Sequence, residues 1–164
     1  MVAAPSVSGL PRPAQVRPIA LSRLSAVAGG SASRLDGPDA AVTGITSGTG
    51  FVHPGDLFAG LPGTHAHGAS FAAQALAAGA VAVLTDAAGA ALVPPGVPTV
   101  LVDDIRERLG EVSALVYGNP SQGMNLLAVT GTSGKTTTTF LMRAGLAAAA
   151  HAVEARLGVR RRRH

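Results

Sequence analysis

The chain has 164 residues, of which 47% are hydrophobic, 3% are aromatic and none is cysteine. This composition permits a packed core of small side chains and excludes disulfides and thiolate metal sites. The formal net charge is +4, but residues 1–150 carry eight basic and eight acidic groups, because the excess lies in the arginine-rich residues 156–163. We therefore expect no nucleic-acid partner for the body of the chain.

The N-terminal 40 residues are predicted to be an irregular segment. Four prolines interrupt regular structure before residue 20, and only residues 21–28 have the pattern of a short helix, which would end at Gly29-Gly30. Residues 1–20 lack the apolar stretch of a secretory signal, and no apolar run reaches the about 20 residues that cross a bilayer. We expect a cytoplasmic monomer with no membrane partner.

Residues 41–118 have the alternating pattern of an α/β domain with a largely parallel sheet. A helix followed directly by a continuous apolar strand is the crossover typical of parallel sheets. Asp104 is expected to cap the second helix. The predicted strands are 41–45, 56–61, 80–84 and 99–102, the predicted helices are 70–78 and 103–117, and residues 87–98 are a loop or a frayed helix. A domain boundary is expected near residues 118–125.

A glycine-rich loop between a predicted strand, 126–130, and a predicted helix, 136–150, is typical of phosphate binding. Its N–H groups would face phosphate oxygens, Lys135 would supply a cation, and the Thr136 hydroxyl would bind Mg²⁺. Val129 stands where the general pattern has its first glycine, and the alternative is a helix-capping turn without a ligand. The predicted ATP-binding residues are Gly131, Thr132, Ser133, Gly134, Lys135, Thr136 and Thr137.

The loop Thr130 to Thr137 resembles the ATP loop of the Mur ligases, which build the peptide stem of bacterial cell-wall precursors. Upstream segments resemble the N-terminal nucleotide-sugar domain of the E-type and F-type members, and the high Ala, Gly and Arg content resembles actinobacterial ones. Tyr117-Gly118-Asn119-Pro120-Ser121 is closer to the E-type. The upstream matches are Pro54-Gly55-Asp56-Leu57-Phe58-Ala59-Gly60-Leu61-Pro62-Gly63, His67-Gly68, Phe71 and Gly79-Ala80-Val81-Ala82-Val83-Leu84.

The resemblance implies ATP and Mg²⁺ as cofactors, with Thr136 as the metal-binding residue. It also implies UDP-N-acetylmuramoyl-L-alanyl-D-glutamate as the acceptor and meso-diaminopimelate, or L-lysine in some relatives, as the amino acid added. Thr49 keeps a hydroxyl where the family has an Asp-Ser-Arg segment, but the acid and the arginine are replaced by glycines. The residues expected at the UDP-sugar site are Ser47, Thr49, Thr64, His65 and Ala66.

The end of the chain departs from the family. Residues 119–150 resemble the start of a central ATPase domain, whereas residues 151–164 form a basic tail that we interpret as a shifted reading frame or a damaged gene. No complete catalytic set is expected, so this chain alone is predicted to be an incomplete, inactive fragment. The alternatives are a fragment of an F-type ligase, a non-catalytic nucleotide-binding module or an inert product.

His65 and His67 form an H-x-H pair, a spacing that can bind a metal ion. Since no third ligand lies nearby in the sequence, we interpret them as loop histidines.

Overall fold

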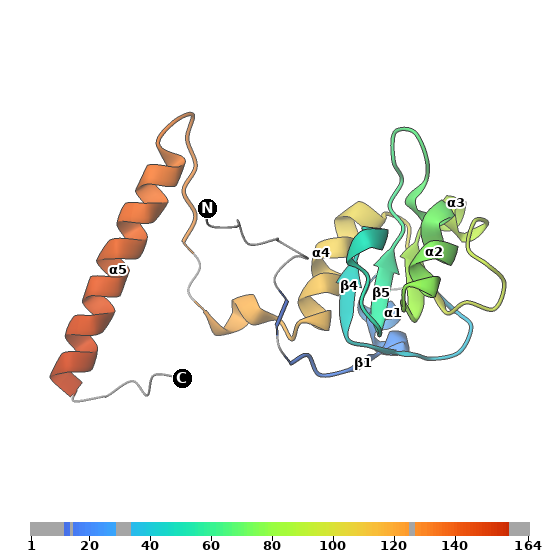
Figure 1. The fold of residues 1–164 in the computed structure, drawn as a ribbon, viewed down its shortest axis with the longest axis horizontal. Helices are drawn as coiled ribbons and strands as arrows, with labels where there is room; N and C mark the ends of the chain where they lie inside the picture. The colour runs from blue at the N-terminus through green and yellow to red at the C-terminus, as the bar shows by residue number, and fades with distance from the viewer. Residues whose placement is uncertain (1–11, 14, 29–33, 125–126, 158–164) are drawn as a thin grey trace, which may run out of the picture. The chain divides into compact units, whose positions relative to one another are not determined.

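The computed structural model describes residues 12–13, 15–28, 34–124 and 127–157. The chain forms two compact units, Met1–Met124 and Asn125–His164. The first unit contains a mixed sheet with helices, and the second contains one long helix preceded by an extended segment (Figure 1).

The main sheet of the first unit has five strands in the order β2-β7-β6-β5-β4. Four of them run parallel, and β2 pairs antiparallel with β7. The predicted α/β fold with a largely parallel sheet is therefore confirmed. The strands are β2 (Arg34–Asp36), β4 (Gly44–Thr46), β5 (Asp56–Ala59), β6 (Ala82–Thr85) and β7 (Thr99–Leu101).

The central strands β5 and β6 are buried along their whole length, as their mostly apolar sequences predict. Alternate side chains enter two separate cores, because successive residues of a strand point to opposite faces. Leu57 and Ala59 pack with α1 (Leu21–Ala28) and α4 (Ile105–Val116), whereas Phe58 packs with α2 (Ala72–Ala77). The sheet thus lies between two layers of helix, with α4 and α2 on opposite sides of β4 and β5 in Figure 1.

The helix ends follow local chemistry. The Asp104 side chain accepts hydrogen bonds from the N–H groups of Arg106 and Glu107, which confirms the predicted cap of α4. Gly79, with φ +112°, follows α2 in a conformation that glycine adopts without strain. The predicted helix 70–78 is divided into a 3₁₀ turn, Gly68–Phe71, and α2.

The described part of residues 1–40 is more regular than predicted. The helix over 21–28 is present as α1, and its buried leucines Leu21 and Leu24 join the core, which ties this segment to the sheet. Strand β2 extends the main sheet by pairing with β7. Strand β1 (Ile19–Ala20) pairs with β3 (Ala41–Val42), so the predicted strand 41–45 is interrupted, its second part being β4. Residues 87–98 contain one short helix, α3 (Ala87–Ala90).

The second unit contains α5 (Lys135–Leu157). The predicted strand 126–130 is wrong for its described part, since residues 127–130 form no strand. A strand needs hydrogen-bonding partners, and none is present within this unit's described residues. The first part of the predicted tail, 151–157, continues α5, and residues 158–164 lie outside the described residues.

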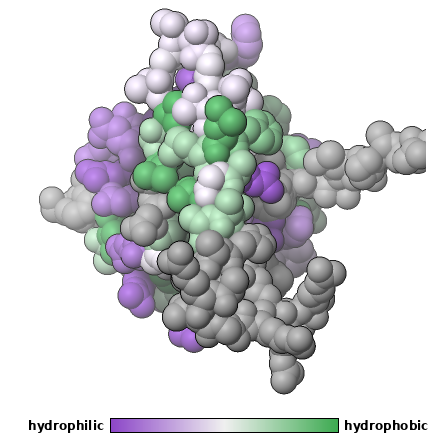
Figure 2. All heavy atoms as spheres, turned by 90° about the vertical axis from the view of Figure 1, so that its left-hand side faces the viewer, coloured by the Kyte–Doolittle hydropathy of each residue, from purple (hydrophilic) through white to green (hydrophobic). Residues whose placement is uncertain are grey.

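Large hydrophobic side chains are exposed on this second unit, and Figure 2 shows hydrophobic residues at the surface of the molecule. None of the described helices, α5 included, combines the length and hydropathy required to cross a membrane. Among the described residues of this unit, the exposed large hydrophobic side chains are Leu127, Phe140, Leu141 and Leu146.

Candidate nucleotide-sugar and phosphate sites

Two of the segments predicted to bind the UDP-sugar follow neighbouring parallel strands. Ser47 and Thr49 come directly after β4, and the loop that carries Thr64, His65 and Ala66 follows β5. Both segments therefore leave the same carboxyl edge of the sheet, where open α/β sheets bind their ligands. Ser47 and the three loop residues are exposed, and Thr49 is half-buried.

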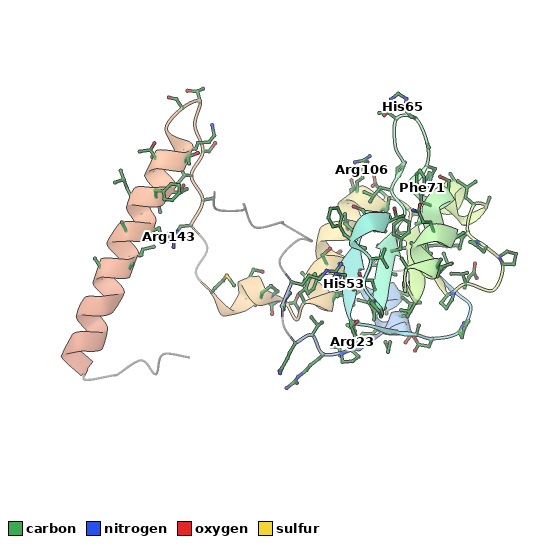
Figure 3. The ribbon with its side chains drawn as sticks, in the orientation of Figure 1. Arg23, His53, His65, Phe71, Arg106 and Arg143 are labelled. Carbon is green, nitrogen blue, oxygen red and sulfur yellow. The ribbon has the colours of Figure 1, made fainter. Side chains whose placement is uncertain are left out.

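The loop after β5 closes on itself at its base. Gly68 donates its N–H to the carbonyl of Leu61 at 2.7 Å, and Pro62 and His67 form an isolated antiparallel bridge. The buried Thr85 hydroxyl donates to the carbonyl of Gly60 at 3.0 Å. The base is therefore held from within and by β6, while His65 projects at the tip (Figure 3).

His67 is fastened through both of its ring nitrogens. Its Nδ1 accepts a hydrogen bond from the N–H of Ala69, and its Nε2 lies 3.1 Å from Oδ1 of Asp86, which follows β6. Since Nδ1 is an acceptor, the neutral ring carries its proton on Nε2 and donates it to Asp86. Both ring nitrogens of His67 are thus engaged in holding the loop. The described residues contain no group of three or more His, Asp or Glu that could hold a metal ion.

Asp86, directly after β6, both holds His67 and caps α3. Its Oδ1 also accepts a hydrogen bond from the N–H of Gly89 at 2.8 Å, which caps α3. Burial alone would raise the pKa of Asp86, but the hydrogen bonds from Gly89 and His67 outweigh burial and lower the pKa below its ordinary value. The geometry therefore favours the carboxylate form, which accepts both hydrogen bonds.

The predicted phosphate loop lies at the start of α5. Gly134, with φ +74°, turns the chain into the helix, and Lys135 is its first residue. The Lys135 ammonium donates to the carbonyl of Gly131 at 2.6 Å, so the side chain lies back over its own loop. Residues 131–137 are exposed, and residues 127–149 contain no acidic residue. The N–H groups of a helix N-terminus and a neighbouring ammonium suit an anion.

Comparison with known proteins places this arrangement in a family. Residues 41–117 match the family described as "Mur ligase family, catalytic domain". This part of the chain is similar to the Mur ligase family. The resemblance inferred from the Pro54-Gly55-Asp56 segment onward is therefore confirmed.

Proteins similar to this chain include actinobacterial ones named UDP-N-acetylmuramoyl-L-alanyl-D-glutamate–2,6-diaminopimelate ligase. The protein of Streptomyces avermitilis is 48% identical over 139 residues, and that of Streptomyces coelicolor is 47% identical over 139 residues. Each match covers 84% of this chain and 27% of the relative. The protein of Corynebacterium glutamicum is 50% identical over 100 residues, which cover 59% of this chain and 19% of the relative. The chain thus spans about a quarter of the length of these Streptomyces relatives.

The first unit contains a buried ion pair that sequence reasoning missed. Asp56 is 1% exposed, and its carboxylate accepts from Nη1 of Arg12 at 2.6 Å and from the N–H of His53 at 2.8 Å. Arg12 also donates to the carbonyl of Phe51. Its bond with Asp56 raises the pKa of Arg12, against the effect of burial. The Pro-Gly-Asp motif marked Asp56, but no local signal linked it to an arginine 44 residues earlier.

Tyr117, directly after α4, makes a second contact between distant parts of the first unit. Its hydroxyl accepts a hydrogen bond from the N–H of Ile45 in β4 at 3.4 Å. A cavity of about 500 Å³ lies beside this contact and includes Ser47, one of the predicted UDP-sugar residues, in its lining. The N-terminal segment and α4 therefore shape the space next to the carboxyl edge of β4. The cavity is lined by Arg12, Pro13, Ile45, Thr46, Ser47, Leu109, Ser113, Tyr117 and Pro120.

Proposed function

We propose that this chain forms the substrate-nucleotide end of an ATP-dependent ligase of peptidoglycan precursor synthesis. The acceptor would be UDP-N-acetylmuramoyl-L-alanyl-D-glutamate, and the added amino acid would be meso-diaminopimelate. The observation that carries the proposal is the 48% identity, over 139 residues, to a relative named for this reaction. An F-type ligase is less favoured, since the relatives described above carry the name of the diaminopimelate enzyme.

The nucleotide part of the acceptor is proposed to bind at the carboxyl edge of β4 and β5. Ser47 and Thr49 offer hydroxyls on one side, and the tip residues Thr64, His65 and Ala66 offer side-chain and backbone donors on the other. Hydroxyls and backbone groups suit the uracil and ribose, which carry several hydrogen-bond donors and acceptors without charge. The anchored base of the loop supports the proposal, because a preordered loop loses less conformational entropy when it binds.

ATP, when bound, would supply the γ-phosphoryl group that activates the acceptor carboxylate. The proposed work of this chain at that loop is binding and charge neutralisation. The N–H groups at Gly131 to Gly134 would donate to phosphate oxygens, and Lys135 would exchange its bond with Gly131 for one with the phosphates. The exposed Thr136 hydroxyl is proposed to bind Mg²⁺. That this chain alone does not join an amino acid to the acceptor stays a prediction.

Isothermal titration of the purified chain with the UDP-linked acceptor tests the nucleotide site. We expect saturable binding that free UDP competes for. Ser47→Ala and Thr64→Ala should each weaken it about three- to tenfold, the effect of losing one hydrogen bond worth about 0.5–1.5 kcal/mol. Gln74→Ala, which removes an exposed polar side chain from α2, serves as the matched control and should leave the affinity unchanged. Binding that is insensitive to both site substitutions would place the nucleotide elsewhere.

A separate titration with Mg-ATP tests the phosphate loop. Lys135→Ala should lower the affinity at least about tenfold, because a charge-assisted bond to a phosphate is worth more than a neutral one. Arg143→Ala, which removes a cation from the same helix outside the loop, is the control. Equal effects of the two substitutions would favour non-specific attraction over a phosphate loop.

A further inference from the structure

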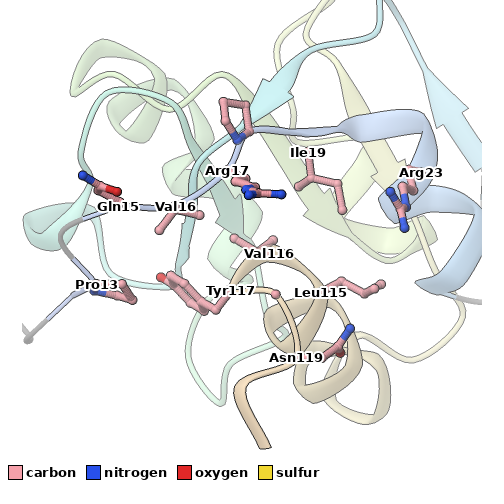
Figure 4. A pocket seen from close by; sticks show the side chains of 12 residues that line it. Pro13, Gln15, Val16, Arg17, Ile19, Arg23, Leu115, Val116, Tyr117 and Asn119 are labelled. Carbon is pink, nitrogen blue, oxygen red and sulfur yellow. The ribbon is translucent and has the colours of Figure 1, made fainter. Parts of the chain in front are cut away.

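A second cavity of about 440 Å³ lies in the first unit, between the N-terminal segment and the end of α4. Figure 4 shows Arg17, Ile19 and Arg23 along one side of it, with Leu115, Val116 and Asn119 along the other. Its apolar lining includes Ile19, Leu115 and Val116. Its polar lining includes two guanidinium groups, those of Arg17 and Arg23, and the amides of Gln15 and Asn119. No acidic residue lines it.

The two arginines differ from the other arginines of this unit whose side chains are described. Arg12 is paired with Asp56, Arg108 with Glu111, and Arg106 donates to the carbonyl of Pro62. Arg17 and Arg23 have no hydrogen bond or ion pair with any described residue. Two exposed cations, without a partner among the described residues, therefore line one cavity.

Neutralisation of the helix dipole does not account for this arrangement. Cations near a helix C-terminus commonly serve its last carbonyl groups. In α4 three of the last four carbonyls already accept from the backbone: Ser113 accepts from Tyr117, Ala114 from Asn119 and Leu115 from Gly118. The guanidinium N–H groups of Arg17 and Arg23 therefore do not donate to the carbonyls of α4.

The cavity is separate from the proposed nucleotide site. Its lining contains none of Ser47, Thr49 and residues 64–66, and only Pro13 and Tyr117 also line the cavity that includes Ser47. In Figure 3, His65 lies at one end of this unit and Arg23 at the opposite end. A ligand in the cavity would therefore occupy a different place from the UDP-sugar.

We propose that this cavity binds a small organic anion, with its phosphate or carboxylate group between Arg17 and Arg23. Planar guanidinium groups recognise both kinds of anion through paired N–H donors. The apolar part of the ligand would rest on Ile19 and Leu115, which are partly buried, beside the buried Val116. The volume lies within the range of small-molecule pockets, about 300–1,000 Å³.

Nuclear magnetic resonance titration of the whole chain with phenyl phosphate tests the proposal. We expect saturable shifts at the methyl groups of Ile19, Leu115 and Val116 at about millimolar concentration. Inorganic phosphate and benzyl alcohol, which carry only the anion or only the ring, should each bind at least about fivefold more weakly, since each makes half of the contacts. Benzoate in a parallel titration distinguishes a carboxylate from a phosphate preference.

Substitution of the arginines provides the decisive comparison. Arg17→Gln and Arg23→Gln should each weaken phenyl phosphate binding about five- to tenfold, and the double variant should abolish it. Arg108→Gln, on the exposed side of α4, is the matched control and should have no effect. Thermal melting verifies that each variant is folded, and affinity of the unsubstituted chain should fall with added salt. Absence of saturable shifts, equal affinity in the double variant, or shifts centred on Ser47 and His65 would each overturn the proposal.

Discussion

The contact between His67 and Asp86 makes the clearest prediction about the loop after β5. His67→Ala removes the acceptor for the N–H of Ala69 and the partner of the Asp86 carboxylate. Both side chains are less than one-fifth exposed, so neither bond is fully replaced by water. Two such bonds are worth about 0.5–1.5 kcal/mol each, which gives a loss of about 1–3 kcal/mol in the free energy of unfolding.

Thermal denaturation measures this loss. At about 4 °C for each kcal/mol in a unit of this size, the melting temperature should fall by about 4–12 °C. His65→Ala removes the same side chain from the exposed tip of the loop and should change it by about 2 °C or less. His67→Asn should recover about half of the loss, since a shorter side chain can still accept from Ala69 but does not reach Asp86.

Hydrogen exchange locates the effect. The amide of Ala69 should exchange faster in His67→Ala than in His65→Ala, since it loses its acceptor only in the first variant. Equal melting temperatures and equal exchange rates in the two variants would refute the reasoning, because they would show that the ring bonds do not hold the loop.

Three further predictions concern charged groups. Arg12→Ala leaves the carboxylate of Asp56 buried and unpaired, and should destabilise the chain by about 2–4 kcal/mol in urea denaturation, whereas Arg108→Ala, at an exposed pair, should cost about 1 kcal/mol or less. Asp104→Ala removes the α4 cap and should cost about 1 kcal/mol by the same measurement. The lowered pKa of Asp86 stabilises the fold above the ordinary value of 3.8, and this contribution should be lost as the pH falls through the folded-state pKa. Asp86→Asn should therefore flatten the pH dependence of unfolding below about pH 4, and an unchanged slope would contradict the pairing.

The core of the sheet was predictable because its information is local. Strands β5, β6 and β7 are mostly apolar, and helices on both faces of the sheet bury their apolar side chains. Strand β2 was missed because it is short, carries two charged residues among its three, and exists only through pairing with β7. The strand predicted for 126–130 failed for the converse reason: its apolar pattern is present, but no described partner strand accompanies it.

The candidate site was predictable where motifs mark it and not where distant residues meet. Ser47 and the loop residues were predicted from the resemblance to the Mur ligases, and the structure places them after β4 and β5. His67 and Asp86 are 19 residues apart, and Arg12 and Asp56 are 44 apart, so each contact depends on the fold that brings them together. Sequence spacing alone carries no signal for such pairs.

The central claim is that the nucleotide of the acceptor binds at the carboxyl edge of β4 and β5. The most direct measurement is an amide nuclear magnetic resonance titration of the whole chain with UDP-N-acetylmuramoyl-L-alanyl-D-glutamate. We predict that the largest saturable shifts fall on Ser47, Thr49 and residues 64–66, with smaller ones at His67. Shifts confined to other parts of the chain would contradict the claim. So would the absence of shifts at concentrations that saturate the Streptomyces avermitilis relative.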